Sequence, residues 1–154
     1  MDKLIYLDNA ATTLYKPQAV YDAVMHAMKN YGNSGRGYGE TSLEASRCIF
    51  EARKCLAEFF GGDNTSGLIF TSNATEALNT VIHGLFNEGD TVITTNLEHN
   101  SVLRPLYYAG ERGVKTEIVS CSDNGFFDAD DIEDMITKAT KAIICTHASN
   151  LTGN

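Results

Sequence analysis

The chain has 154 residues, 43% of them hydrophobic, a length and composition typical of a single domain with a sizeable core. Its formal net charge of -8 comes from 12 basic and 20 acidic residues without a long block of either sign, so nucleic acid is not expected as a partner. The N-terminus lacks the pattern of a signal peptide, and no run of about 18 apolar residues occurs, so we expect no membrane association and a cytoplasmic protein.

The first predicted element is an amphipathic helix over residues 17–30. Its apolar residues recur at helical spacing and form one stripe: Val20, Ala23, Val24, Ala27 and Met28. A second helix is predicted from Ser42 to Phe60, where Gly61 and Gly62 end it. Two helices therefore open the chain.

The loop between these helices contains four glycines within residues 32–39. It resembles a dinucleotide-binding fingerprint only superficially, because it follows a helix instead of a strand and its glycine spacing differs. Arg36 in this loop has two interpretations, a contact with a carboxylate or an ordinary exposed side chain.

Four cysteines occur, and none forms a CxxC pair, so no metal site is expected. Cys48 and Cys55 are seven residues apart, which places them on one face of the second helix. A free cysteine behaves as a small hydrophobe, and we predict that both are packed in the core.

From residue 67 onward, strands and helices alternate. The predicted order is strand 67–71, helix 75–86, strand 91–95, a helix ending before Gly113, strand 115–119, helix 129–138 and strand 142–146. Serial alternation with nearly continuous apolar strands predicts an α/β fold, a mostly parallel sheet with helices on both faces. We divide the chain into residues 1–62, helical with the glycine-rich loop, and residues 63–154, the first part of the α/β domain.

Polar residues follow three of the predicted strands: Ser72 to Thr75, Asn96 to Asn100, and His147 to Asn150. Ligands of open parallel sheets bind outside the carboxyl ends of the strands. These three segments are therefore the candidate site.

The segment FTSNATEALN, residues 70–79, has two interpretations that do not exclude each other. The first amides of a helix lack partners within the helix. Asn73 could cap them, with Glu76 completing a capping box. Alternatively, the amides of Ala74 and Thr75 could bind a phosphate, which the helix dipole also favours.

His99 and Asn150 allow the same two kinds of interpretation. A single histidine near a helix start is usually a surface residue, but at a strand end an imidazole could lie against a planar cofactor or move protons. Asn150 could cap a turn or bind a ligand oxygen, and His147 could neighbour the ligand or only pack.

Taken in order, the motifs YLDNAATT, GRG, SLEASR, FTSNATEALN, LEHNSVLRP and THASNLTG resemble the pyridoxal phosphate-dependent class V aminotransferases. The resemblance is strongest to cysteine desulfurases and selenocysteine lyase-like proteins, and it covers essentially the whole chain. It implies the large domain of that fold, with pyridoxal 5'-phosphate as the cofactor.

The resemblance also implies roles for individual residues. Ala74 and Thr75 match the cofactor-phosphate site, and Asn150 matches the amide that bonds the ring hydroxyl oxygen. His99 matches the catalytic imidazole stacked on the pyridine ring. Asn73 replaces the usual glycine, a change we expect to be tolerated because asparagine adopts positive φ better than most residues.

Two further segments match the family. Asn9, Ala10 and Ala11 resemble the segment that lines the substrate entrance. Loop 32–39 resembles one that approaches the active site of the dimer, although the histidine that many members carry near Gly39 is absent.

The family's Schiff-base lysine, its pyridinium-binding aspartate and its sulfur-accepting cysteine all lie beyond the position that matches Asn154. We therefore expect the N-terminal fragment of a cysteine desulfurase-like enzyme, which releases sulfur from L-cysteine to give alanine. The fragment is expected to be inactive alone and to bind the cofactor weakly or not at all. A homodimer and a sulfur-acceptor protein are expected partners of the parent enzyme.

The sequence is also consistent with two alternative functions. The chain could be a non-catalytic module that acts by association or by phosphate binding. The parent could also catalyse another class V reaction, namely transamination or selenocysteine cleavage.

Overall fold

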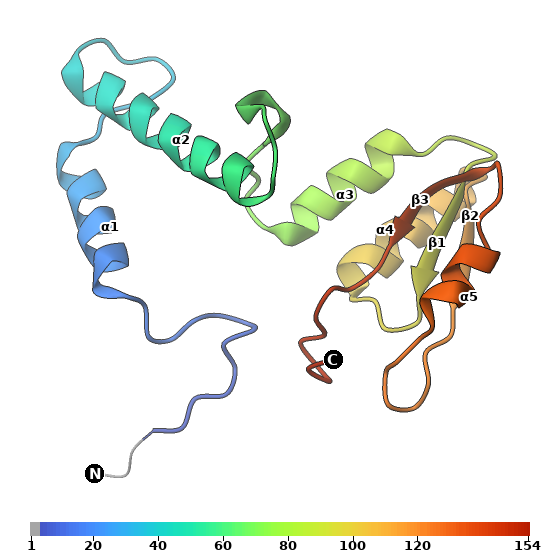
Figure 1. Ribbon diagram of the computed structural model, residues 1–154. Helices are drawn as coiled ribbons and strands as arrows, with labels where there is room; N and C mark the ends of the chain where they lie inside the picture. The colour runs from blue at the N-terminus through green and yellow to red at the C-terminus, as the bar shows by residue number, and fades with distance from the viewer. Residues whose placement is uncertain (1–3) are drawn as a thin grey trace. The chain divides into compact units, whose positions relative to one another are not determined.

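The computed structural model describes residues 4–154, which divide into two compact units (Figure 1). The N-terminal unit ends at Phe70, and the C-terminal unit runs from Thr71 to Asn154. None of the helices formed by the described residues is long and apolar enough to cross a membrane.

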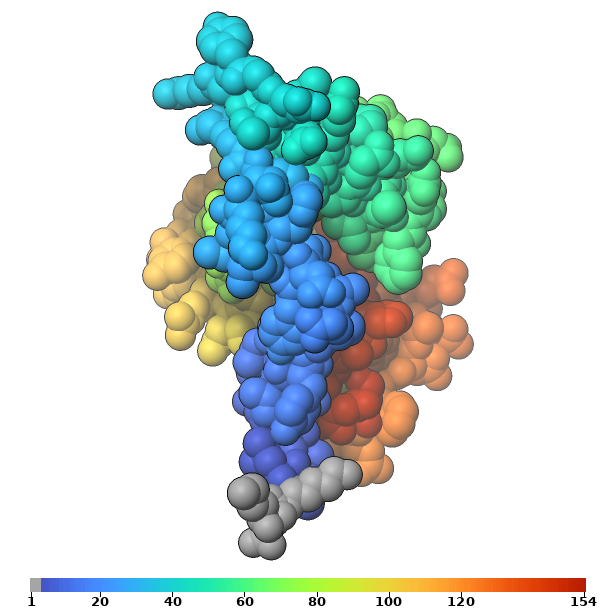
Figure 2. Space-filling model, turned by 90° about the vertical axis from the view of Figure 1, so that its left-hand side faces the viewer, coloured from blue at the N-terminus to red at the C-terminus, as the bar shows by residue number. Residues whose placement is uncertain are grey.

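The N-terminal unit consists mainly of two helices that bury few of their own side chains. Its elements are α1 (Gln18–Asn30), α2 (Glu40–Phe59) and the short 3-10 helix η1 (Thr65–Gly67). Both predicted helices are present. However, α1 buries none of its residues, and Val24 and Met28 of its apolar stripe are 55% and 78% exposed. Figure 2 shows the α1 side chains, in blue, at the surface.

The predicted strand over residues 67–71 is wrong. Residues 65–67 form η1, and Leu68 continues with extended backbone, φ -107° and ψ 123°, but without a neighbouring strand. An extended segment becomes a strand only when another backbone pairs with it. Ile69 and Phe70 accordingly remain 80% and 45% exposed.

The prediction that Cys48 and Cys55 are buried is also wrong, because both are exposed. They do share one face of α2, but that face lines an open groove with His26 and Tyr31. A helical stripe of small apolar residues is buried only where another element covers it.

The C-terminal unit contains a three-stranded parallel sheet in the order β2-β1-β3. The strands are β1 (Thr91–Thr95), β2 (Lys115–Val119) and β3 (Thr140–Ile144), and the helices are α3 (Ala74–Leu85), α4 (Asn100–Glu111) and α5 (Ala129–Asp134). Figure 1 shows α4 and α5 on opposite faces of the sheet. The predicted α/β class with helices on both faces is confirmed.

The core of this unit lies between the sheet and helices α3 and α4. Its buried members are Ile82, Phe86, Val92, Val102, Leu106, Ala109 and Val114. Val92 pairs with Ala142 of β3, which packs against the same cluster. The central strand β1 is buried along its whole length.

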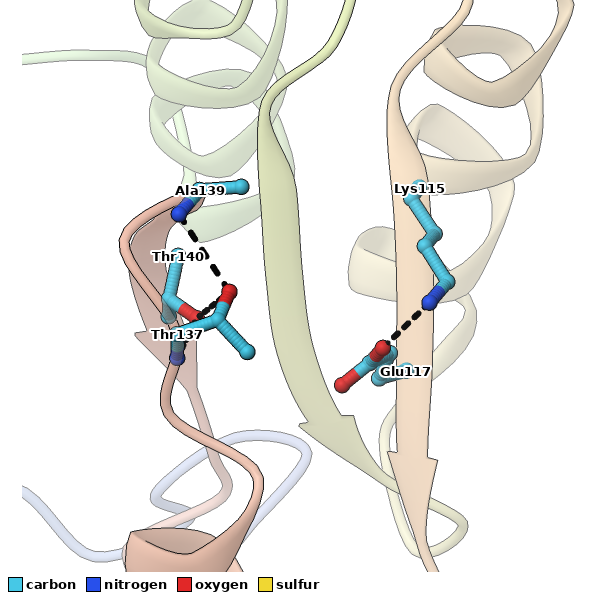
Figure 3. A network of polar contacts seen from close by, with 5 residues as sticks. All are labelled: Lys115, Glu117, Thr137, Ala139 and Thr140. Atoms are coloured by element: carbon cyan, nitrogen blue, oxygen red, sulfur yellow. Dashed lines mark hydrogen bonds and ion pairs between the residues drawn. The ribbon is translucent and has the colours of Figure 1, made fainter.

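The segment before β3 differs from the prediction at its boundaries. Helix α5 ends at Asp134 instead of residue 138, and β3 begins at Thr140, two residues before the predicted start. A turn explains the shift, because the Thr137 N–H donates to Thr140 Oγ1 at 2.8 Å and the Ala139 N–H donates to Thr137 Oγ1 at 3.2 Å (Figure 3). On β2, Lys115 and Glu117 form an ion pair of 2.6 Å (Figure 3).

Candidate functional site

The carboxyl ends of the three strands lie at one edge of the sheet, because all three strands are parallel. The segments after β1 and β3 together line a pocket of about 320 Å³. Its lining residues are Asn96, Leu97, Glu98, His99, Asn100, Ser149, Asn150, Leu151 and Thr152. The structure therefore brings His99 and Asn150, which are far apart in the sequence, to the same pocket.

His99 is the N-cap residue of α4, and this role fixes its ring. The backbone N–H of Ser101 donates to His99 Nδ1 at 3.1 Å, and Ser101 Oγ lies 2.9 Å from the same nitrogen. Because a backbone N–H can only donate, Nδ1 is an acceptor and the neutral ring carries its proton on Nε2. The cap thus leaves the Nε2–H free for a ligand.

The start of α3 forms the cap predicted for it. Asn73 Oδ1 accepts the Glu76 N–H at 2.9 Å, and Glu76 Oε2 accepts the Ser72 N–H at 2.7 Å. The backbone N–H of Ser72, followed by its side chain, holds the pKa of Glu76 below its ordinary value. Asn73 has φ -169° and ψ 170°, ordinary extended backbone. The expectation that its tolerance of positive φ matters is therefore wrong.

This cap leaves two helix amides unused. Among residues 4–154, no hydrogen bond takes the N–H of Ala74 or of Thr75, and both residues are exposed. Unpaired amides in the first turn of a helix are the groups that bind anions. The cap and an anion site would therefore use different N–H groups.

The turn after β1 is bonded to both neighbouring strands, a feature that the sequence interpretation missed. Asn96 Oδ1 accepts the Cys121 N–H at 3.0 Å, just after β2. Glu98, only 8% exposed, accepts the Thr146 N–H at 2.7 Å and the Thr146 hydroxyl at 2.9 Å, just after β3. A carboxylate at the end of an apolar strand, next to the candidate histidine, is the sequence signal that could have pointed to it.

His147 lies in the segment that follows β3. It lines an adjoining pocket of about 340 Å³, together with Phe126, Phe127 and Cys145, and the two pockets share Leu97 and Ser149. It is therefore not among the residues that line the pocket with His99 and Asn150.

Asn9, Ala10 and Ala11 belong to the N-terminal unit, where they form an exposed turn. The Ala11 N–H donates to the Asp8 carbonyl at 3.2 Å, and the Tyr6 hydroxyl donates to the Thr12 carbonyl at 2.8 Å. In the glycine-rich loop of the same unit, the Arg36 N–H donates to Asn33 Oδ1 at 2.9 Å.

The C-terminal unit is thus an α/β structure with a polar pocket at the carboxyl ends of parallel strands, where such sheets bind ligands. The chain belongs to the aminotransferase class-V family, whose pattern matches residues 5–154.

Individual relatives give the same result. The chain is 38% identical over 151 residues to a probable cysteine desulfurase from Methanothermobacter thermautotrophicus, covering 97% of this chain and 37% of that protein. It is similar to the apo structure of a cysteine desulfurase from Thermococcus onnurineus, with a TM-score of 0.86, 37% identity, and 97% and 38% of the two chains covered.

A cysteine desulfurase from Escherichia coli is also similar, with a TM-score of 0.77, 26% identity, and 97% and 39% of the two chains covered. The chain therefore spans somewhat over a third of the length of these relatives.

Proposed function

We propose that this chain is part of a pyridoxal 5'-phosphate-dependent cysteine desulfurase and contributes the contacts that hold the cofactor. The observation that carries the proposal is the common pocket of His99 and Asn150 at the strand ends, in a chain similar to cysteine desulfurases over 97% of its length. The proposed substrate is L-cysteine, from which the whole enzyme removes sulfur to leave alanine.

The donor groups on the chain fit this cofactor. The unpaired N–H groups of Ala74 and Thr75 suit its phosphate, because the helix dipole adds to two free donors. The His99 ring, held by Ser101, is proposed to lie against the pyridine ring. Asn150 is proposed to donate its amide hydrogen to the ring hydroxyl oxygen.

Bound pyridoxal phosphate supplies an electron sink for bond cleavage in an amino acid. The contribution of this chain is to orient that group and to hold a proton beside it. His99 holds its proton on Nε2 because Ser101 occupies Nδ1. We propose this Nε2–H as the proton that His99 exchanges during the reaction.

Other parts of the proposal concern the whole enzyme. Asn9, Ala10 and Ala11 are proposed to line the substrate entrance, and the enzyme is proposed to act in the cytoplasm as a homodimer that passes sulfur to an acceptor protein. Neither a Schiff-base lysine nor a sulfur-accepting cysteine matches the family pattern in these 154 residues. The chain alone is therefore proposed to bind the cofactor weakly or not at all and to be inactive.

Titration of the chain with pyridoxal phosphate, followed by the cofactor's visible absorbance, tests the proposal. We expect His99→Ala and Asn150→Ala each to weaken binding by about tenfold, the loss of one good contact to a bound ring. His83→Ala is the matched control, because His83 is exposed on α3 and lies outside the pocket. Equal affinities for the wild type and all three variants would contradict the proposed site.

The enzyme assignment has its own test in a longer protein that carries the matching lysine. It is expected to bind pyridoxal phosphate covalently and to release sulfide from cysteine. The absence of both the cofactor's visible absorbance and sulfide release would overturn the assignment. Sulfide-free turnover of another amino acid or of selenocysteine would support the transaminase or selenocysteine lyase alternative.

A second candidate function is a non-catalytic module that acts by association. The observation that favours it is the uncovered apolar stripe of α1, on which Val24 and Met28 are exposed. Light scattering and calorimetric titration with phosphate separate the two functions. A monomer indifferent to phosphate would argue against the module.

A further inference from the structure

We propose that Glu98 is a positioning residue that fixes the distance between His99 and Asn150 by joining the ends of β1 and β3. The cofactor part of this inference rests on the proposed function. The mechanical part rests only on the contacts of the C-terminal unit.

Glu98 uses both carboxylate oxygens in this junction. Oε1 accepts the Thr95 hydroxyl at 2.9 Å and the Thr146 N–H at 2.7 Å, and Oε2 accepts the Thr146 hydroxyl at 2.9 Å. Bonds to a buried charged acceptor are stronger than bonds between neutral groups. Glu98 therefore ties the last residue of β1 to a residue just after β3.

The residues on either side of this junction carry the proposed contacts. His99 follows Glu98 directly and is held by its cap on Ser101. Asn150 follows Thr146 by four residues, in a loop closed by its own bonds: the Gly153 N–H donates to the Ser149 carbonyl at 3.0 Å, and the Ser149 N–H donates to the Asn154 carbonyl at 2.8 Å. Each side is thus held by its own hydrogen bonds, and Glu98 links the two sides beyond the last paired residues of β1 and β3, Thr94 and Ile144.

The contacts assign Glu98 a geometric role and leave it no part in proton transfer. Its three donors are the Thr95 hydroxyl and the two Thr146 groups, and none of them belongs to His99 or Asn150. A glutamine could keep the same arrangement, because its Oε1 can accept the Thr95 hydroxyl and the Thr146 N–H. Its amide can donate to Thr146 Oγ1 after that hydroxyl rotates. An alanine can make none of these bonds.

The experiment compares Glu98→Gln, Glu98→Ala and Thr146→Val with wild type, and uses Glu117→Ala as the matched control. Glu117 is also a glutamate of the sheet region, but it pairs with the exposed Lys115 on β2. Hydrogen exchange of the Thr146 amide, measured by NMR on the 154-residue chain, reports the junction itself. Titration with pyridoxal phosphate reports its effect on the site.

In Glu98→Ala we expect exchange of the Thr146 amide to accelerate, and cofactor affinity to fall, by at least about tenfold, the effect of losing a charged hydrogen-bond acceptor. Thr146→Val, which loses only the hydroxyl bond, should change both by about threefold. Glu98→Gln should fall between wild type and Glu98→Ala, because it keeps the partners but loses the charge. Glu117→Ala should stay within about twofold of wild type.

Wild-type behaviour of Glu98→Ala in both measurements would overturn the proposal. Equal losses in Glu98→Gln and Glu98→Ala would also overturn it, because charge would then matter more than geometry. If Glu98→Ala does not fold, Thr146→Val decides: wild-type exchange and wild-type cofactor affinity in this variant would overturn the proposal. A loss in Glu98→Gln much larger than in Thr146→Val would also overturn it. If the wild type binds no measurable cofactor, the exchange rates alone decide whether Glu98 joins the strands, and the longer protein that carries the matching lysine decides the proposed function.

Discussion

The two units of the chain use similar apolar patterns with different results. Helix α1 carries a regular apolar stripe and buries none of it, whereas α3 buries Ile82 completely. The caps differ too, because α1 and α2 have no side-chain cap, while α3, α4 and α5 are capped by Asn73, His99 and Asp128. Periodicity therefore predicts which face of a helix is apolar, but burial of that face requires a second surface within reach.

The largest expected effect tests this difference in burial. Ile82→Ala should lower the free energy of unfolding by about 2–5 kcal/mol, because it opens a cavity in the core of the C-terminal unit. Val24→Ala on α1 should change it by less than about 0.5 kcal/mol, because Val24 is 55% exposed. Urea unfolding followed by circular dichroism measures both. A cost for Val24→Ala equal to that of Ile82→Ala would mean that the α1 stripe is covered in solution.

A smaller effect tests the caps. Asn73→Ala should cost about 1 kcal/mol, the usual loss when an N-cap acceptor is removed. Asn73→Asp keeps an acceptor oxygen and should preserve stability, but its charge next to the amides of Ala74 and Thr75 should weaken phosphate binding. Thermal unfolding and phosphate titration of the two variants measure these effects separately. If Asn73→Asp bound phosphate better than wild type, the anion site would not lie at this cap.

The smallest expected effect is a contrast in pH dependence. The pKa of Glu76 is lowered by the hydrogen bonds that Ser72 donates to it. The stability that these bonds contribute is present above the ordinary pKa of 4.5 and is lost as the pH falls through the folded-state pKa. The pKa of Tyr31, in the N-terminal unit, is raised chiefly by the neighbouring Cys48 thiol. Its contribution to stability is therefore present below 10.0 and is lost as the pH rises further.

Helicity measured across the pH range should therefore decline at opposite extremes in the two units. Glu76→Gln and Tyr31→Phe each remove one titrating group. Glu76→Gln should flatten the acid decline, and Tyr31→Phe should flatten the alkaline decline. No change in either profile would contradict these assignments.

The sequence predicted the helices and strands of the C-terminal unit best. In that unit, the apolar strands and helix faces that the sequence predicts find other strands and helices to pack against. Strands β1 and β2 begin and end at the predicted residues, because β1 is buried along its whole length and β2 pairs with it residue for residue. The strand predicted at 67–71 failed because no neighbouring backbone pairs with it in residues 4–154. The burial of Cys48 failed for the corresponding reason, because in residues 4–154 that face of α2 lines an open groove.

The candidate site shows a similar limit. Strand-end positions pointed to His99 and Asn150, and the structure places both at one pocket. The sequence did not show that His99 is itself a cap, because this depends on the bond from Ser101. Nor did it reveal Glu98, whose partner Thr146 lies 48 residues away in the chain.

The order of the strands also bears on how the sheet is assembled during synthesis. The central strand β1 is made first, and each outer strand is added later by a crossover, β2 through α4 and then β3 through α5. A ribosome-bound chain can therefore complete the β1–β2 pair while β3 is still inside the exit tunnel. On that view the pocket is the last feature of the unit to form, because one of its two walls follows β3.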